Sequence, residues 1–251
     1  MAAYGSIRIE DTEKIRVIRI SKESTLNPLD IETLEEIADA IANSGERIIV
    51  ITGSERAFSA GANIKKFESL DPRSAYDMAR RGHKVMDFIA SYHRPVIAAI
   101  KGFALGGGFE LALACDLRIA SPDTKLGLTE TNLGILPGWG GTQRLKGIAG
   151  KTRAFEMIAF GQMITADEAL KYGILNAVTE DYFEYSMKLA TELSGRAMTA
   201  ISYVKDLMGY ERNDAGYEAE KEMFGKIFST QDSKEGVMSF LEKRKPSYIW
   251  K

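Results

Sequence analysis

Short β-rich runs that alternate with segments of helical periodicity constrain the fold of this chain more than any other feature. The runs occupy Ile15–Ile20, Arg47–Thr52, Pro95–Ile100 and Asp116–Ala120. Strands that alternate with helices are typical of α/β folds, and strands buried on both faces have near-continuous apolar sequences. The sequence therefore predicts an α/β protein whose strands are mostly buried.

Residues 29–42 illustrate the helical segments. Apolar side chains fall on one face of a helix there. They are Leu34, Ile37, Ala38 and Ile41. Asp30 is a favourable N-cap residue, so we expect the helix to begin at that position.

The β signal fades after about Thr165, and the rest of the chain has helical patterns. The segments are Asp167–Tyr172, Tyr182–Leu193, Thr199–Met208, Ala215–Phe228 and Glu235–Lys243. Gly195 is a break between helices, and no Pro- or Ser-rich linker separates the two parts of the chain. We expect a core domain over residues 1–194 and a closely packed helical region over residues 195–251.

The composition argues against several classes of protein. A net charge of -2 and a pI near 5.9 give no reason to expect binding to nucleic acid or to a membrane surface. The single cysteine, Cys115, cannot form an internal disulfide. The first residues do not resemble a presequence, and the weakly charged stretch 97–115 is interrupted by Lys101 and Glu110. A cytoplasmic protein without a membrane segment is expected.

Common metal and cofactor sites are not indicated. The two histidines, His83 and His93, have no second partner at ligand spacing, so a zinc site is not expected. A phosphate-binding P-loop motif is missing, and the segment around Ser59 lacks the first glycine of a nucleophile elbow. The GFALGGG run does not match the dinucleotide-binding fingerprint. We therefore expect neither a metal nor a cofactor.

Two glycine-rich segments follow predicted strands, at Ala57–Phe67 and Lys101–Asp116. In the second, three glycines at 106–108 lead into Phe109–Ala114, an apolar run of good helix formers. The N-terminus of a helix presents unpaired N–H groups and a positive dipole end, which suit a developing anion. The alternative is that the glycines only permit a tight turn and close packing, and a lone triplet favours that alternative.

Glu110 and Glu130 are candidates for acid–base chemistry. Glu110 falls in the first turn of the predicted helix, where a carboxylate also complements the helix dipole. Glu130 lies in a loop, where a solvated acid is the ordinary interpretation. Two carboxylates on separate elements can converge on one water and one carbon. A third glycine cluster, residues 137–142, follows and precedes a helix.

Five segments together resemble the crotonase superfamily, the enoyl-CoA hydratases and isomerases, along nearly the whole chain. They occur in the order and at the approximate spacing of that family. The segments are AFSAGANIK, RPVIAAIKGFALGGGFELALACDLRIAS, LGLTETNLGILPGWGGTQRL, ITADEALKYGILNAV and FLEKRKP. The resemblance implies a spiral of ββα units, a C-terminal helical trimerisation region, and assembly as a trimer or a dimer of trimers.

The resemblance also implies an enoyl-CoA hydratase that adds water across the double bond of an acyl-thioester. Backbone N–H groups of Ala62 and Gly107 would form the oxyanion hole for the thioester oxygen. Glu110 would orient and activate the water, and Glu130 would transfer the proton at the α-carbon. The N–H of Gly138 would help to hold the water. Coenzyme A is then part of the substrate rather than a cofactor.

Three residues match family positions that contact coenzyme A. Lys65 would lie near the adenine or the phosphates, and Phe224 and Lys243 would reach the coenzyme from a neighbouring subunit. Each has a plain alternative: a solvated lysine, a core aromatic side chain, and a charge in an exposed run.

Two positions depart from the family pattern. Asn63 replaces the usual aspartate beside Ala62, and residues 22–29 lack the usual proline and nearby lysine. The first change bears on the geometry of the oxyanion hole, and the second bears on contacts with the coenzyme.

Other functions stay open. Double-bond isomerisation and dehydration of a specialised 3-hydroxyacyl-CoA use the same oxyanion hole, whereas the presence of both glutamates favours hydration. A non-catalytic scaffold or RNA-binding module of the same fold is the alternative from another class. The acyl chain length depends on pocket walls near Phe67–Phe88, whose shape the sequence does not reveal.

Overall fold

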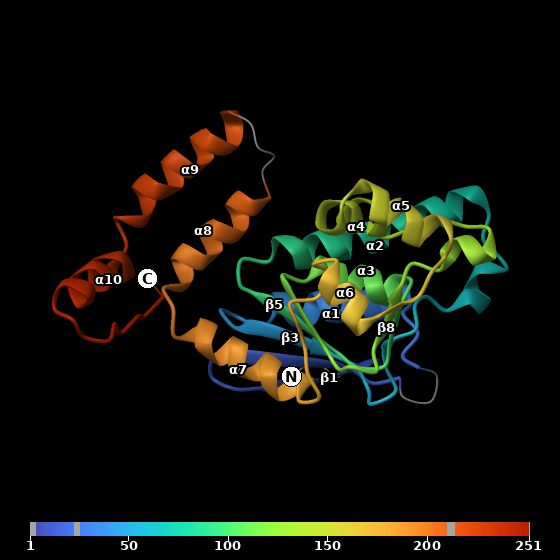
Figure 1. Ribbon diagram of the computed structural model, residues 1–251, viewed down its shortest axis with the longest axis horizontal. Helices are drawn as coiled ribbons and strands as arrows, with labels where there is room; N and C mark the ends of the chain where they lie inside the picture. The colour runs from blue at the N-terminus through green and yellow to red at the C-terminus, as the bar shows by residue number, and fades with distance from the viewer. Residues whose placement is uncertain (1–3, 23–25, 210–213, 251) are drawn as a thin grey trace.

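A six-stranded sheet is the larger of two sheets in the computed structural model, which describes residues 4–22, 26–209 and 214–250 (Figure 1). Its order is β1-β2-β3-β5-β7-β10, and its neighbouring strands are parallel except for the antiparallel pair β1–β2. The strands are β1 Ile7–Asp11, β2 Ile15–Ile20, β3 Ile48–Thr52, β5 Val96–Ile100, β7 Leu117–Ala120 and β10 Ala177–Val178. The four strands predicted from the sequence are β2, β3, β5 and β7, so that prediction is confirmed.

A four-stranded sheet, in the order β4-β6-β8-β9, lies beside the larger one. Its strands are β4 Ala57–Ser59, β6 Phe103–Leu105, β8 Lys125–Gly127 and β9 Ile164–Thr165. Strands β4, β6 and β8 are mutually parallel, and β9 is antiparallel to β8. Along the chain β4 follows β3, β6 follows β5 and β8 follows β7, and a helix follows each pair. The chain therefore winds as the predicted spiral of ββα units.

Helices cover both faces of the larger sheet. The α-helices are α1 Ile31–Ala42, α2 Pro72–Ser91, α3 Gly107–Ala114, α4 Gly141–Ala149, α5 Lys151–Ala159, α6 Ala166–Lys171, α7 Tyr182–Ser194, α8 Met198–Met208, α9 Asp214–Ile227 and α10 Gln231–Leu241. Two 3-10 helices, η2 Ile64–Phe67 and η3 Glu130–Leu133, complete the set for the described part of the chain. In Figure 1, α7 lies on one side of the larger sheet, and helices α1 to α5 lie on the other side.

Strand β3 shows how the core is divided between the two faces. Ile49 and Ile51 belong to the cluster that contains side chains of α1, α2 and α3. Ile48 and Val50 pack instead with Tyr182 and other side chains of α7. Because successive side chains of a strand point to opposite faces, burial of both faces requires the continuous apolar run seen in the sequence.

The helix starts are set by local side chains. Asp30 is the N-cap of α1, as predicted, and its carboxylate accepts from the N–H of Thr33 at 2.9 Å. At the start of α2, Asp71 and Ser74 form a reciprocal capping box, and Pro72 occupies the first helical position.

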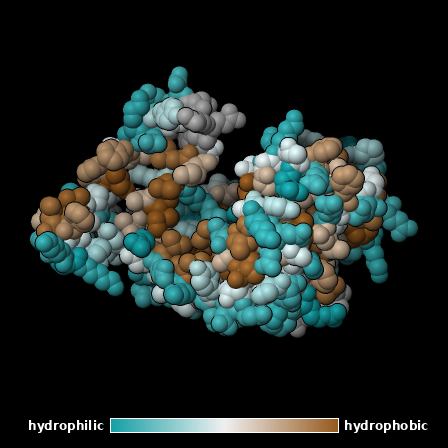
Figure 2. All heavy atoms as spheres, in the orientation of Figure 1, coloured by the Kyte–Doolittle hydropathy of each residue, from teal (hydrophilic) through white to brown (hydrophobic). Residues whose placement is uncertain are grey.

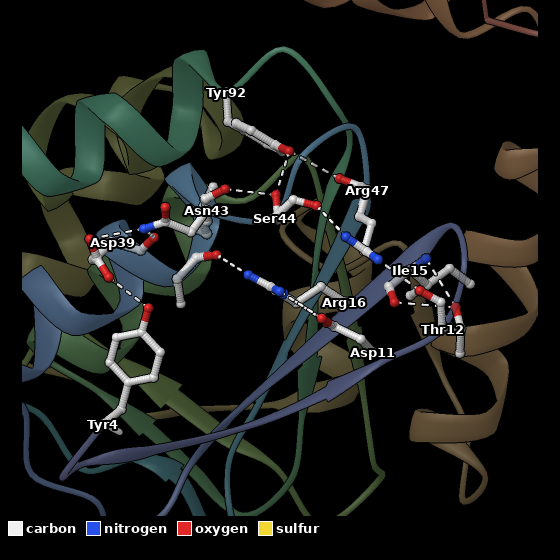
Figure 3. Close-up of polar contacts among 12 residues, drawn as sticks. Tyr4, Asp11, Thr12, Ile15, Arg16, Asp39, Asn43, Ser44, Arg47 and Tyr92 are labelled. Carbon is white, nitrogen blue, oxygen red and sulfur yellow. Dashed lines mark hydrogen bonds and ion pairs between the residues drawn. The ribbon is translucent and has the colours of Figure 1, made fainter. Parts of the chain in front are cut away.

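A partly buried polar cluster ties the first hairpin to the helices (Figure 3). The guanidinium of Arg16 donates to both carboxylate oxygens of Asp11, at 2.7 and 2.6 Å, and to the carbonyl of Ala40 at 2.7 Å. The hydroxyls of Tyr92 and Ser44 share a hydrogen bond of 2.7 Å. The Arg16 contacts hold β1 and β2 against the C-terminal end of α1, and the Tyr92–Ser44 bond joins the residues that follow α2 and α1.

The last three helices extend away from the two sheets (Figure 1). Helix α8 contacts the core through Ser202, which accepts from Arg94 at 2.9 Å, and through Lys205, which pairs with Asp116 at 2.7 Å. Figure 2 shows apolar side chains gathered over the C-terminal helices. The large exposed ones are Val204, Met208, Tyr217, Phe224, Phe228, Val237, Met238, Phe240 and Leu241. The division at residues 194 and 195 stays a prediction.

The structure adds elements that the sequence pattern did not reveal. Strand β10 follows Thr165, where only helices were expected, and β4, β6 and β8 have three residues each. Glu130 begins the 3-10 helix η3 rather than lying in an open loop. Among the described residues, no helix combines the length and the apolar character needed to cross a membrane.

Candidate active site

A cavity of about 170 Å³ lies at one end of the smaller sheet. Its lining residues are Ala60, Gly61, Ala62, Ile64, Phe67, Met78, Gly106, Gly107, Glu110, Thr129, Glu130, Leu133, Ile135, Leu136, Gly138 and Trp139. Strands β4, β6 and β8 are neighbours and parallel, so their carboxyl ends meet at one edge. The segments that follow these strands carry Ala62, Gly107 with Glu110, and Glu130 respectively. The sheet topology therefore brings together residues far apart in the sequence.

Two residues that line this cavity, Ala62 and Gly107, have backbone N–H groups without a backbone acceptor among the described residues. Gly107 is the first residue of α3, so its N–H has no partner within the helix. Neither its N–H nor that of Ala62 donates to another group in the described part of the chain. Gly61, at φ 99°, brings the two loops close, since a Cβ there would lie 2.8 Å from the carbonyl oxygen of Leu105. The pair is suited to stabilising an oxyanion.

Glu110 is almost completely buried, with 1% of its surface exposed. One carboxylate oxygen, Oε1, accepts from the N–H of Trp139 and from that of Gly141, both at 2.8 Å. Burial raises the pKa of Glu110, while these two hydrogen bonds and the charge of Arg144 act in the opposite direction. The carboxylate is therefore fixed in orientation, with its second oxygen available to a ligand.

Glu130 has a different environment. Its Oε2 is buried and has no hydrogen-bond partner among the residues described. Burial, and then the negative charge of Glu110, raise the pKa of Glu130 to about 7. A Cβ on Gly106 would lie 3.1 Å from Oε1 of Glu130, which places this carboxylate beside the start of α3. Because its pKa is raised to about 7, Glu130 keeps its proton in part of the molecules near neutral pH. A second carboxyl group, Glu110, lies in the same cavity, and such a pair suits acid–base chemistry.

Gly138 also lines the cavity, in the loop that precedes α4. A Cβ at this position would meet no heavy atom within 4 Å, so the backbone faces open space. The structure thus brings Ala62, Gly107, Glu110, Glu130 and Gly138, all selected from the sequence, to one cavity.

The three expected coenzyme contacts are not brought together within one chain. Lys65 is exposed on η2, between the cavity residues Ile64 and Phe67 but not itself in the lining. Phe224 is 67% exposed on α9 and packs edge-on against Phe228. Lys243 is exposed and follows α10, and both helices lie far from α3 in Figure 1. A role for Phe224 and Lys243 requires a second subunit.

The two departures from the family pattern have different settings. Asn63 occupies the N-cap position of η2, but its side chain makes no capping hydrogen bond. Its backbone N–H donates to the carbonyl of Leu29 at 3.0 Å. Asn27 is fully buried, and its side chain bridges the N–H of Lys22 and the carbonyl of Ala57. Residues 23–25 of the second segment lie outside the described residues.

The sequence interpretation anticipated part of the cavity wall and missed Trp139. Phe67 and Met78 come from the range expected to shape the pocket, whereas Phe88 of that range lines another groove. Trp139 was not selected, although it is the one large side chain in the third glycine cluster, residues 137–142. A large aromatic side chain among glycines is the signal that could have identified it.

Comparison with known proteins places these observations in a family. The family model described as enoyl-CoA hydratase/isomerase matches residues 10–251. A crotonyl-CoA hydratase of Syntrophomonas wolfei is 39% identical over 259 aligned positions, covering 99% of this chain and 100% of that protein. A probable enoyl-CoA hydratase of Bacillus subtilis is 42% identical and covers 88% of this chain and 90% of its own. The crystal structure of an enoyl-CoA hydratase from Bacillus anthracis superposes with a TM-score of 0.92 at 34% identity, covering 98% of this chain and 100% of that one.

Proposed function

Because the chain belongs to the enoyl-CoA hydratase/isomerase family, we propose that it is an enoyl-CoA hydratase. The reaction is the reversible addition of water to a 2-trans-enoyl-CoA, which gives a 3-hydroxyacyl-CoA. One observation carries the proposal: the buried carboxyl group of Glu110 and the half-buried one of Glu130 line the same cavity as the unpaired N–H groups of Ala62 and Gly107. The names of the relatives from Syntrophomonas wolfei and Bacillus subtilis agree with this reaction.

The thioester carbonyl binds with its oxygen between the N–H groups of Ala62 and Gly107. As water attacks the β-carbon, negative charge accumulates on that oxygen, and these donors stabilise it together with the positive end of the α3 dipole. Removal of one such donor typically costs about a hundredfold to a thousandfold in rate. The oxyanion hole therefore makes the enolate accessible.

The two glutamates divide the proton transfers. Water, held by Glu110 and the N–H of Gly138, forms a bond from its oxygen to the β-carbon while one of its protons passes to the Glu110 carboxylate. The electrons of the double bond move into the enolate. Glu130 then gives its proton to the α-carbon. The product carries the hydroxyl at the β-carbon and the new hydrogen at the α-carbon.

The pair holds one proton before and after the reaction. That proton is on Glu130 at the start of hydration and on Glu110 at the end, and dehydration uses the same groups in reverse. Transfer of the proton between the two carboxyl groups restores the starting state. The raised pKa of Glu130, about 7, is matched to this acid role at neutral pH.

Coenzyme A is bound by residues from two subunits. Lys65 contacts the adenine or phosphates of coenzyme A from its own chain, and Phe224 and Lys243 contact the coenzyme of a neighbouring subunit. Such contacts require an oligomer, and we propose a trimer or a dimer of trimers that acts in the cytoplasm. The large exposed apolar side chains of α8, α9 and α10 support such an assembly.

The direct test follows the ultraviolet absorbance of crotonyl-CoA with the purified protein and two variants, Glu110→Gln and Glu130→Gln. The parent is expected to consume the conjugated thioester and to form 3-hydroxybutyryl-CoA. Each variant is expected to be slower by on the order of a hundredfold or more, because each lacks one proton-transfer group. Glu184→Gln, an exposed glutamate on α7, is the matched control and should retain parental activity.

The same assay separates the alternatives. An isomerase would shift a 3-enoyl-CoA into conjugation and would tolerate the loss of one glutamate. Acyl-CoA binding without consumption of crotonyl-CoA would contradict the hydratase proposal and favour another reaction of the family. If the parent neither consumes nor binds acyl-CoA, a non-catalytic function is the remaining interpretation.

A further inference from the structure

Trp139 forms a buried part of the wall of the active-site cavity. Its side chain is only 3% exposed, although it stands in a loop of glycines. It lines the cavity that holds Glu110 and Glu130, and it also lines a second, larger and more open cavity of about 470 Å³. Phe67 and Met78 line both cavities as well. The indole is therefore part of the wall that separates the site from additional space.

The indole is held in place by two helices. A Cβ on Gly107 would lie under 3.0 Å from ring carbons of Trp139, and so would a Cβ on Gly82 of α2. The ring therefore lies directly against the backbones of α3 and α2, and it cannot turn aside unless these helices move. Its Nε1 is buried without a partner in the described structure, so packing rather than a hydrogen bond sets its position.

The size of the cavity limits how much of the substrate it can bury. A cavity of about 150 Å³ lined by apolar side chains accommodates one benzene molecule. The present cavity, about 170 Å³ in volume, must accept the thioester carbonyl and the acyl chain together. A short chain fits this space, whereas a long one needs either the second cavity or an exit to solvent.

The exit to solvent offers little binding energy. The rim residues Leu133 and Leu136 are 57% and 70% exposed, and Ile64 is 49% exposed. A chain that leaves past these side chains keeps much of its surface in water. Each methylene that is fully buried improves binding by roughly fourfold, and each one left in water contributes little.

We propose that Trp139 sets the upper limit on acyl chain length, so that the substrates are short-chain 2-enoyl-CoA thioesters with four to six acyl carbons. This rests on the proposed hydratase function. Replacement of the indole by a smaller side chain connects the cavity to the one behind it. Longer chains then reach the apolar side chains of that second cavity, Leu29 and Ile31 among them, while the proton-transfer groups stay on their own elements.

The test compares hydration of four-, six-, eight- and ten-carbon 2-enoyl-CoA by the parent, Trp139→Phe and Trp139→Leu. We expect parental kcat/KM to be highest for four or six carbons. In Trp139→Leu the ratio of kcat/KM for ten carbons to that for four carbons should rise at least tenfold. Trp139→Phe should change the same ratio in the same direction by about threefold. Trp250→Phe, which changes the other tryptophan outside the cavity, should leave the ratio at the parental value.

The outcomes distinguish failure of this inference from failure of the hydratase proposal. A parent that is inactive on every chain length contradicts the hydratase proposal. The role of Trp139 is contradicted if the parent is active and Trp139→Leu or Trp139→Phe has the parental ratio of kcat/KM for ten carbons to that for four carbons. Thermal melts show which variants are folded.

Calorimetric binding to the parent alone gives a test that needs no variant. Saturated butyryl-CoA and decanoyl-CoA should bind with dissociation constants within about tenfold of each other. A decanoyl-CoA affinity a hundredfold or more above that of butyryl-CoA would show that the long chain is already buried, and it would overturn the proposal.

Discussion

At the scale of single residues, Glu110 and Glu130 have the same side chain in two different environments. Two backbone N–H groups hold Glu110 and partly offset the cost of its burial. Glu130 has a buried oxygen without a partner, and it also feels the charge of Glu110. The ionised form is therefore easier to keep at Glu110, and the proton resides on Glu130. This is why one can activate water while the other supplies a proton.

The shared proton predicts a bell-shaped pH profile. Activity requires one proton on the pair, so kcat/KM should fall at alkaline pH with an apparent pKa of about 7, as Glu130 ionises in the free enzyme. It should fall again at acidic pH, when the pair takes up a second proton. Hydration and dehydration should give the same kcat/KM profile, because both use the singly protonated pair. Steady-state rates with crotonyl-CoA and 3-hydroxybutyryl-CoA measure both.

Two variants make the pH test specific. The residual activity of Glu130→Gln should lack the alkaline limb near neutrality, whereas Glu184→Gln should keep the parental profile. A parental kcat/KM that does not change across neutral pH would contradict the assignment of the proton to Glu130.

At the scale of elements, α3 is a short helix surrounded on all sides. All of its residues are buried, so neighbouring segments must pack closely around the whole helix, and α3 has no polar face toward solvent. Gly106, at φ 48°, turns the chain from β6 into the helix, and Gly107 faces the indole of Trp139. Gly108 lies against the backbone of β4 at Ser59. The glycines therefore serve packing and the oxyanion hole at once.

Two glycine-to-alanine substitutions should have opposite effects. A Cβ at Gly108 would lie under 3.0 Å from the carbonyl oxygen of Ser59, so Gly108→Ala should destabilise the protein by about 1–3 kcal/mol. It should also reduce activity strongly, because a displaced α3 moves the N–H of Gly107 and the carboxylate of Glu110. Gly147 in α4 has nothing within 4 Å of a Cβ, so Gly147→Ala should stabilise by roughly 0.5–1 kcal/mol.

Thermal melts and kcat/KM values measure both glycine variants. For a chain of this size, 1 kcal/mol corresponds to about 2–4 °C in Tm. Equal melting temperatures and equal activities for the two variants would show that α3 tolerates a small displacement from β4.

At the scale of the whole molecule, the chain has the crotonase fold, an α/β fold with two sheets of mainly parallel strands and C-terminal helices. The core is complete within one chain, since both faces of the larger sheet are covered. The C-terminal helices, in contrast, leave large apolar side chains exposed within one chain. Phe240 and Met208 are 83% and 80% exposed, which is unusual for large apolar side chains unless another surface covers them.

We expect the purified protein to be a trimer or a dimer of trimers, and Phe240→Asp to shift it toward smaller species. The aspartate would carry a charge on that face of α10, and removing this charge from water opposes packing of the face against another subunit. Light scattering coupled to size-exclusion chromatography measures the mass. Lys234→Asp, an exposed lysine on the same helix, introduces the same residue and should leave the mass unchanged.

Dissociation also tests the coenzyme contacts. If Phe224 and Lys243 act across a subunit boundary, smaller species should have a higher KM for crotonyl-CoA. A monomeric parent, or a Phe240→Asp variant with unaltered mass, would contradict the proposed assembly.

Much of this architecture was predictable from the sequence, for identifiable reasons. Strands β2, β3, β5 and β7 lie in β-rich runs of the sequence, and Asp30 and Gly195 mark helix ends through local side-chain and backbone chemistry. The short strands β4, β6 and β8 were not predictable, because three residues carry too little periodicity to distinguish a strand from a loop. Strand β10 has two residues and forms because it pairs with β7.

The sequence by itself determined the alternation of strands and helices, the glycine loops and the five positions selected for the site, because each depends on local pattern or on motif text. Tertiary structure decided that Ala62, Gly107 and Glu130 meet, since this depends on β4, β6 and β8 lying side by side and parallel. It also decided the pKa of Glu130, which follows from burial and from a neighbour twenty positions away in the chain. The position of Trp139 between two helices is of the same kind, because packing across distant segments has no signature in a single stretch of sequence.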